Sequence, residues 1–248
     1  MSRTIDFMFS LTESILIYWL INCAMSSRFS GTKKTFAIVL AILINAAFIQ
    51  YVPDFPITAR FLLYFIFSLI LSQIIYTGKI FIKAFFILVA NYIILISDII
   101  AGNFASYLIK INIQNILNVS ITSFAFSILA KLLNVILIMI FIYYFQKIKF
   151  EIPQRYWIIM DVIVLFLAII LQFIMEISPI LQEESSEYSI YIFGISIGFL
   201  IISGLVIFFF GEICFYHEKQ KENYILSMRN HSLEQQLTYH ESATADLM

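Results

Sequence analysis

Four ionisable residues lie inside long apolar stretches of this 248-residue chain: Glu13, Asp98, Lys131 and Asp161. A charge near the middle of a membrane-spanning helix costs about 2.5–3.5 kcal/mol on insertion scales, so each needs a partner or a function. Counting from the ends of the stretches predicts that the first three lie in the outer half of a helical bundle and can meet there. Asp161 is predicted near the inner face. Two interpretations stay open for the first three: a polar site that responds to a ligand, or a buried ion pair that only fixes helix packing.

The composition explains why these charges are exceptional. Hydrophobic residues make up 61% of the chain and charged residues 12%, whereas a typical soluble domain has roughly 25% charged residues. A soluble domain of this length buries only about 70–75% of its surface, so lipid must be the solvent for much of this chain. This excludes a soluble enzyme, a nucleic-acid binder and a disordered chain.

Seven apolar stretches are long enough to position these charges inside a membrane. A spanning helix needs about 20 mostly apolar residues, and the alternation typical of an outer-membrane barrel is missing. The sequence therefore predicts an all-α membrane protein with about seven transmembrane helices followed by a cytoplasmic coiled-coil-like helix. The predicted spans are residues 5–24, 36–52, 60–77, 82–101, 121–146, 156–178 and 190–211.

The distribution of basic residues predicts the orientation in the cell membrane. Eleven of the 15 Lys and Arg residues lie in connections on one side, and only three lie on the other. Cytoplasmic loops carry the excess of positive charge, so we expect the N-terminus outside and the C-terminus in the cytoplasm. The outer loops are then 53–59, 102–120 and 179–189. The last of these is acidic, with Glu183, Glu184 and Glu187.

The composition changes sharply after residue 211. Residues 212–248 are rich in charge and contain neither Pro nor Gly, so a helix can continue out of the last span. We therefore divide the chain into a transmembrane sensor domain, 1–211, and a signalling or dimerisation helix, 212–248. A heptad pattern predicts a dimer seam with several polar positions, although a solvated helix without a partner stays open. The seam positions are Asn223, Leu226, Asn230, Leu233, Leu237, His240, Thr244 and Leu247.

The order of these elements and the tail phrase LEQQLTYHE, Leu233 to Glu241, resemble the sensor half of peptide-pheromone receptor histidine kinases of the AgrC/ComD type. The resemblance implies an extracellular peptide ligand and a homodimer, with a response regulator as partner only where a kinase half is present. The chain departs from the family in its histidines, since none of His217, His231 and His240 has the context of a phosphoacceptor. No motif for ATP or metal binding is recognised either, so we expect no cofactor, no metal and no enzymatic activity.

The leading hypothesis is a receptor that detects an extracellular peptide and transmits the signal through its last span to a cytoplasmic dimer helix. The acidic outer loop favours a ligand with a positive end. Two alternatives stay open: a small-solute transporter or permease component, and a membrane scaffold that acts through residues 212–248. The sequence indicates no nucleic-acid partner.

Overall fold

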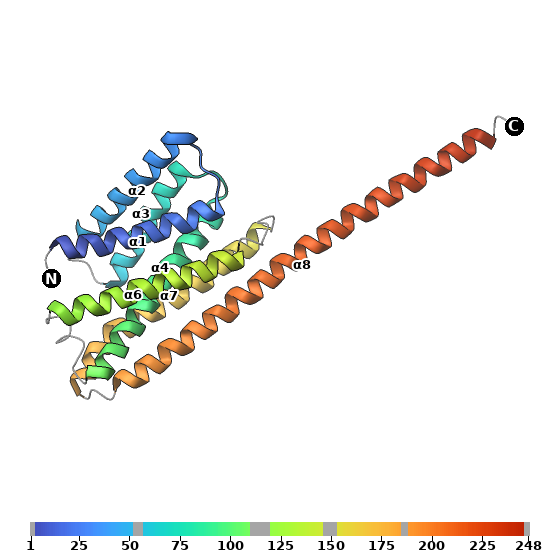
Figure 1. Ribbon diagram of the computed structural model, residues 1–248. Helices are drawn as coiled ribbons and strands as arrows, with labels where there is room; N and C mark the ends of the chain where they lie inside the picture. The colour runs from blue at the N-terminus through green and yellow to red at the C-terminus, as the bar shows by residue number, and fades with distance from the viewer. Residues whose placement is uncertain (1–2, 52–56, 110–119, 146–152, 185–187, 246–248) are drawn as a thin grey trace.

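The structure is a computed structural model that describes residues 3–51, 57–109, 120–145, 153–184 and 188–245. These ranges contain seven α-helices and no β-strand (Figure 1). The helices pack side by side as a bundle, and the last one extends far beyond it. Their bounds are α1 Arg3–Ala24, α2 Gly31–Tyr51, α3 Ile57–Ile75, α4 Ile80–Ile109, α6 Ser120–Phe145, α7 Gln154–Glu184 and α8 Tyr188–Ala245.

The helices confirm an all-α membrane protein that crosses the bilayer several times. Among the described residues, six helices are long and apolar enough to span a membrane. The apolar part of α3, Ala59–Ile75, is shorter, with 17 residues. At 1.5 Å per residue this segment covers about 26 Å, which is close to the roughly 30 Å of a bilayer's hydrocarbon core. All seven predicted spans therefore correspond to helices.

Helix α4 forms the centre of the bundle. It packs against α1, α3, α6, α7 and α8, while α2 packs on the outside against α1 and α3. In the most apolar 18-residue window of its segment Ile80–Tyr107, 89% of the residues are buried inside the protein. A polar side chain on α4 therefore faces other helices in most cases, where it can find partners that lipid does not offer.

Two connections close one end of the bundle together. The main-chain N–H of Arg28 donates to the carbonyl of Ile75 at 2.8 Å, and Thr77 N–H donates to the carbonyl of Ser26 at 2.9 Å. Lys83, fully buried in the first turn of α4, donates to the Tyr76 carbonyl at 2.7 Å. These bonds place the α1–α2 and α3–α4 connections at the same face, opposite the N-terminus (Figure 1).

Helix α8 is one continuous helix of 58 residues, and at 1.5 Å per residue it is about 87 Å long. It begins beside α4 and α7 and leaves the bundle at the end where the α1–α2 and α3–α4 connections lie (Figure 1). The side chains of residues 219–236 are all exposed. The helix continues through the predicted boundary at 211/212, so the two proposed domains share one backbone element.

All three predicted outer loops are partly helical. Residues 57–59 belong to α3, residues 102–109 to α4, residue 120 to α6, residues 179–184 to α7 and residues 188–189 to α8, so the predicted loops are wrong in these parts. The physical reason is visible at Asn103, whose side chain is buried and satisfied inside the bundle. Its Nδ2 donates to the Ile99 carbonyl at 2.8 Å, and its Oδ1 accepts the Ser178 hydroxyl at 3.3 Å. Polarity at this position marks a contact between two helices.

Candidate functional site

The bundle brings three of the predicted ionisable residues together. Glu13 comes from α1, Asp98 from α4 and Lys131 from α6. The Lys131 ammonium donates to Glu13 Oε1 at 2.5 Å and to Asp98 Oδ1 at 3.2 Å. The prediction that these residues meet is confirmed, whereas a response of this group to a ligand stays a prediction.

This ion cluster is only partly closed to its surroundings. The side chain of Lys131 is 13% exposed, that of Glu13 21% and that of Asp98 33%. An ammonium group offers three donors, and the two carboxylates take two of them. Each carboxylate keeps further acceptor sites, and the three groups together carry a formal charge of −1 when ionised. Such a cluster in low dielectric favours a further positive charge or hydrogen-bond donors nearby.

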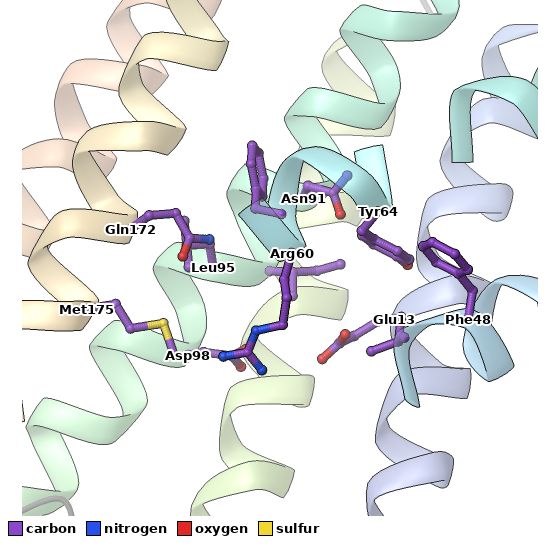
Figure 2. A pocket seen from close by; sticks show the side chains of 12 residues that line it. Glu13, Phe48, Arg60, Tyr64, Asn91, Leu95, Asp98, Gln172 and Met175 are labelled. Atoms are coloured by element: carbon purple, nitrogen blue, oxygen red, sulfur yellow. The ribbon is translucent and has the colours of Figure 1, made fainter. Parts of the chain in front are cut away.

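A cavity of about 280 Å³ adjoins the ion cluster. Side chains from α1, α2, α3, α4 and α7 converge on it, and Glu13 and Asp98 form part of its wall (Figure 2). The cavity is therefore positioned by the same helices that hold two members of the cluster. Its lining residues are Glu13, Phe48, Ile49, Arg60, Phe61, Tyr64, Asn91, Ile94, Leu95, Asp98, Gln172 and Met175.

Arg60, on α3, is the positively charged residue of the cavity wall, and its side chain is exposed. Figure 2 shows its guanidinium pointing into the space between Asp98 and Glu13. The formal charges of Arg60, Lys131 and the two carboxylates sum to zero. By sequence, Arg60 is the first residue of the predicted third span and one of the three basic residues on the outer side, which offers no sign of a partner.

Two buried carboxamides also line the cavity. Asn91 of α4 is 6% exposed and Gln172 of α7 is 5% exposed. Within the described part of the chain, Asn91 Nδ2 and Gln172 Oε1 have no hydrogen-bond partner. A buried polar atom without a partner costs about 1–3 kcal/mol. Sequence reasoning missed both residues, although a carboxamide in an apolar stretch was a usable signal.

A hydrogen-bonded network holds the neighbouring wall in place. Asn45 of α2 donates through Nδ2 to the Tyr64 hydroxyl at 2.9 Å and to the Ser14 hydroxyl at 3.4 Å. The Ser68 hydroxyl donates to Asn45 Oδ1 at 3.1 Å. One buried side chain thus ties α1, α2 and α3 together, directly beside Glu13. The network positions Tyr64, whose ring lines the cavity.

Other predicted site residues lie elsewhere. Asp161 of α7 joins neither the ion cluster nor the cavity wall, and both of its buried carboxylate oxygens lack a partner among the described residues. Glu183 and Glu184 belong to the last residues of α7, and Glu187 lies outside the described residues. Groups of three or more His, Cys, Asp or Glu side chains that could hold a metal are not found where the structure is described.

The predicted dimer seam falls on the part of α8 beyond the bundle. Asn223, Leu226, Asn230 and Leu233 are exposed there, with Leu226 at 54% and Leu233 at 51%. Leu237, His240 and Thr244 belong to the same helix, whereas Leu247 lies outside the described residues. Exposed leucines at a spacing of seven offer a surface that a second helix could bury.

The chain was compared with known proteins at the level of sequence and fold. No protein-family model, curated protein or solved structure matches it. The ion cluster, the cavity and helix α8 are the features of the chain that bear on its function.

Proposed function

We propose that this chain is the sensor half of a two-component histidine kinase, a receptor that detects an extracellular peptide. The observation that carries the proposal is helix α8, which begins inside the membrane bundle and continues without a break into an exposed helix. In this proposal the peptide binds at the outer mouth of the bundle, and α8 conveys the change to the cytoplasm.

The contacts of α8 support this route. The Tyr92 hydroxyl of α4 donates to the Phe199 carbonyl of α8 at 3.2 Å, and the Tyr144 hydroxyl of α6 donates to the Phe208 carbonyl at 3.1 Å. Further along α8, Phe210 packs against the buried Trp157 with ring centroids 5.1 Å apart. A movement of α4 or α6 would therefore move α8.

Aromatic packing strengthens the coupling near the point where α8 leaves the bundle. Phe85 of α4 lies 5.6 Å from Phe210 of α8 and 5.3 Å from Trp157 of α7, measured between ring centroids. Such tightly packed contacts have few intermediate arrangements, so small shifts become discrete movements. Signalling also requires that the ligand binds the two arrangements of the bundle with different affinity.

The proposed assembly is a homodimer that pairs through the seam on α8, with the N-terminus outside and the C-terminus in the cytoplasm. A response regulator is a partner only if a kinase half is attached. The ligand would have a positive end that the acidic residues of the 179–189 region attract, and apolar side chains that suit the aromatic and Ile-rich bundle.

The proposal is tested by fusing residues 1–248 to a complete kinase core in lipid vesicles. Conditioned medium and candidate peptides are titrated, and phosphorylation of the kinase is measured. We expect a saturable change with peptide in the wild-type fusion and none in a Lys131→Met fusion or in the more stable triple variant Glu13→Gln, Asp98→Asn, Lys131→Met. A folded and active fusion that ignores every peptide would contradict the proposal.

A small-solute transporter is the second candidate, because a cavity and four ionisable groups lie within the membrane bundle. Charged groups in membrane helices frequently mark transport pathways. Uptake of labelled solutes into vesicles that contain the chain would support this alternative. Peptide-dependent kinase output from sealed vesicles that take up no solute would exclude the transporter.

A further inference from the structure

We propose that a lipid-facing groove between α2 and α3 binds one negatively charged phospholipid, with an acyl chain in the groove and the headgroup phosphate at Lys33. The groove is separate from the cavity beside the ion cluster, and its occupant does not depend on the receptor function. Three observations carry the proposal: the lining of the groove, its length, and the charge at one of its ends.

The groove has a volume of about 590 Å³, and its lining is almost entirely apolar. Several of the lining side chains are exposed, so the groove opens toward the surrounding lipid. Helix α2 packs against α1 and α3 and lies on the side of the bundle away from α8 (Figure 1). An acyl chain can therefore enter from the bilayer. The apolar wall includes Phe36, Leu40, Ile44, Leu71 and Ile74.

The groove has the depth of one leaflet of the bilayer. Its wall on α2 extends from Thr32 and Lys33 to Ile44. At 1.5 Å per residue, the rise from Lys33 to Ile44 is about 17 Å, and half of the roughly 30 Å hydrocarbon core is about 15 Å. Lys33 belongs to the first turn of α2, so it lies at the membrane interface when Ile44 lies near the bilayer centre. A lipid that stands in one leaflet has the same dimensions.

The charge at the interface end favours a negative headgroup. Lys33 and Thr32 are exposed in the groove wall, where their ammonium and hydroxyl groups can donate to phosphate oxygens. Residues 14–53 contain three basic residues and no Asp or Glu. The α3–α4 connection, which is hydrogen-bonded to the α1–α2 connection, adds Lys79. The ammonium of a zwitterionic headgroup would meet no carboxylate among the described lining residues. A headgroup with a net negative charge is attracted by all of these lysines.

The proposal is tested with the full chain in phosphatidylcholine nanodiscs that contain a small fraction of phosphatidylglycerol with a diazirine in one acyl chain. Illumination links this lipid to nearby side chains, and mass spectrometry of peptides measures the label on residues 36–44 and 71–75. Phosphatidylcholine with the same diazirine chain is the reference. We expect about fivefold more label from phosphatidylglycerol, as one lysine near the headgroup implies. Unlabelled phosphatidylglycerol should compete saturably.

Charge variants test the headgroup contact. Lys33→Gln should lower the preference for phosphatidylglycerol to less than about twofold, and Lys33→Arg should keep it, because the positive charge stays at the groove. Lys79→Gln is the matched control. Lys79 is exposed at the same end of the bundle but does not line the groove, so this variant should keep the wild-type preference.

A pair of leucines on α2 tests the acyl-chain contact. Leu40 lines the groove and is 44% exposed, whereas Leu43 does not line it and is 45% exposed. We expect Leu40→Trp to fill the groove and to remove the saturable label on residues 71–75, while Leu43→Trp should keep this label. Both side chains face lipid, so both variants should keep the wild-type unfolding midpoint.

Several results would overturn the proposal. Equal label from the two lipids, or an equal loss in Lys33→Gln and Lys79→Gln, would indicate a diffuse attraction without a site. A saturable label that survives in Leu40→Trp would place the lipid elsewhere. Oxidative linkage of two Leu40→Cys chains in a Cys23→Ser, Cys214→Ala background, without lipid label, would show that a second copy covers the groove. None of these measurements uses kinase output, so the lipid site and the receptor can fail independently.

Discussion

At the scale of single residues, Lys131 decides whether the centre of the bundle is stable. Its ammonium lies between the carboxylates of Glu13 and Asp98. Without it, two like charges would face each other among buried helices. Lys131 is therefore the charge whose structural role is clearest from its contacts. A ligand that displaced it from the two carboxylates would disturb the bundle.

Replacing this lysine should cost stability whatever its signalling role. We expect Lys131→Met to lower the free energy of unfolding by about 1–3 kcal/mol, less than the roughly 3–5 kcal/mol of a fully buried pair, because the side chains of Glu13 and Asp98 stay partly exposed. The midpoint of thermal unfolding in detergent measures the effect. The triple variant Glu13→Gln, Asp98→Asn, Lys131→Met removes all three charges and should recover most of the loss. A single variant with the wild-type midpoint would show that the cluster contributes nothing to folding.

At the scale of elements, the interface between α6 and α8 depends on the absence of a side chain at Gly211. A Cβ at this position would overlap the ring of Tyr144. The same tyrosine donates its hydroxyl to the Phe208 carbonyl of α8 at 3.1 Å. The glycine thus permits a close approach at the point where α8 leaves the bundle.

The close approach can be tested against a matched glycine of the same helix. We expect Gly211→Ala to be less stable than Gly204→Ala by about 1–2 kcal/mol, because Tyr144 must turn away and lose its hydrogen bond. A Cβ at Gly204 meets no atom within 4 Å, so both variants share the gain in helix propensity and differ only in the clash. In a Tyr144→Leu background the difference between the two variants should shrink toward zero. Equal unfolding midpoints in the wild-type background would contradict this account.

The free part of α8 should pair with a second copy along one face. In a Cys23→Ser, Cys214→Ala background, we expect oxidation to link two chains at Leu226→Cys and Leu233→Cys. Ser232→Cys, an exposed position on another face of the helix, is the control and should link much less. Gel mobility under non-reducing conditions measures the product. Equal yields of disulfide-linked dimer at all three positions would indicate random collisions between chains and would contradict a defined seam.

At the scale of the whole molecule, the proposed orientation rests on the distribution of charge and on the seven helices of the described residues. The described connections that carry basic residues, α1–α2 and α3–α4, are hydrogen-bonded to each other. They lie at the end from which α8 leaves, opposite the N-terminus (Figure 1). This is the arrangement in which one membrane face collects most of the positive charge.

Reporter fusions test the orientation in the cell membrane. We expect a fluorescent protein fused after Met248 to fluoresce and alkaline phosphatase at the same position to be inactive, because basic loops stay in the cytoplasm. A phosphatase fusion within the predicted outer loop 53–59 should be active and serves as the control. The reverse pattern would place the seam of α8 outside and contradict the signalling proposal.

The apolar helices and their number could be predicted from the sequence, because a bilayer demands about 20 apolar residues per span and tolerates few charges. The same reasoning identified Glu13, Asp98 and Lys131, since a charge inside such a stretch is conspicuous. Helix ends were less predictable. Asn103 looked like a loop residue, yet its side chain is satisfied between α4 and α7.

The sequence by itself determined that this protein is an all-α membrane bundle with three charges that need one another. Only the tertiary structure decided which other groups surround them. Arg60, Asn91 and Gln172 come from three different helices, and no spacing along the chain relates them. The hydrophobicity and charge of each segment decide whether it enters the membrane, and both can be read from the sequence. A cavity depends on which helices pack side by side, and that is visible only in the tertiary structure.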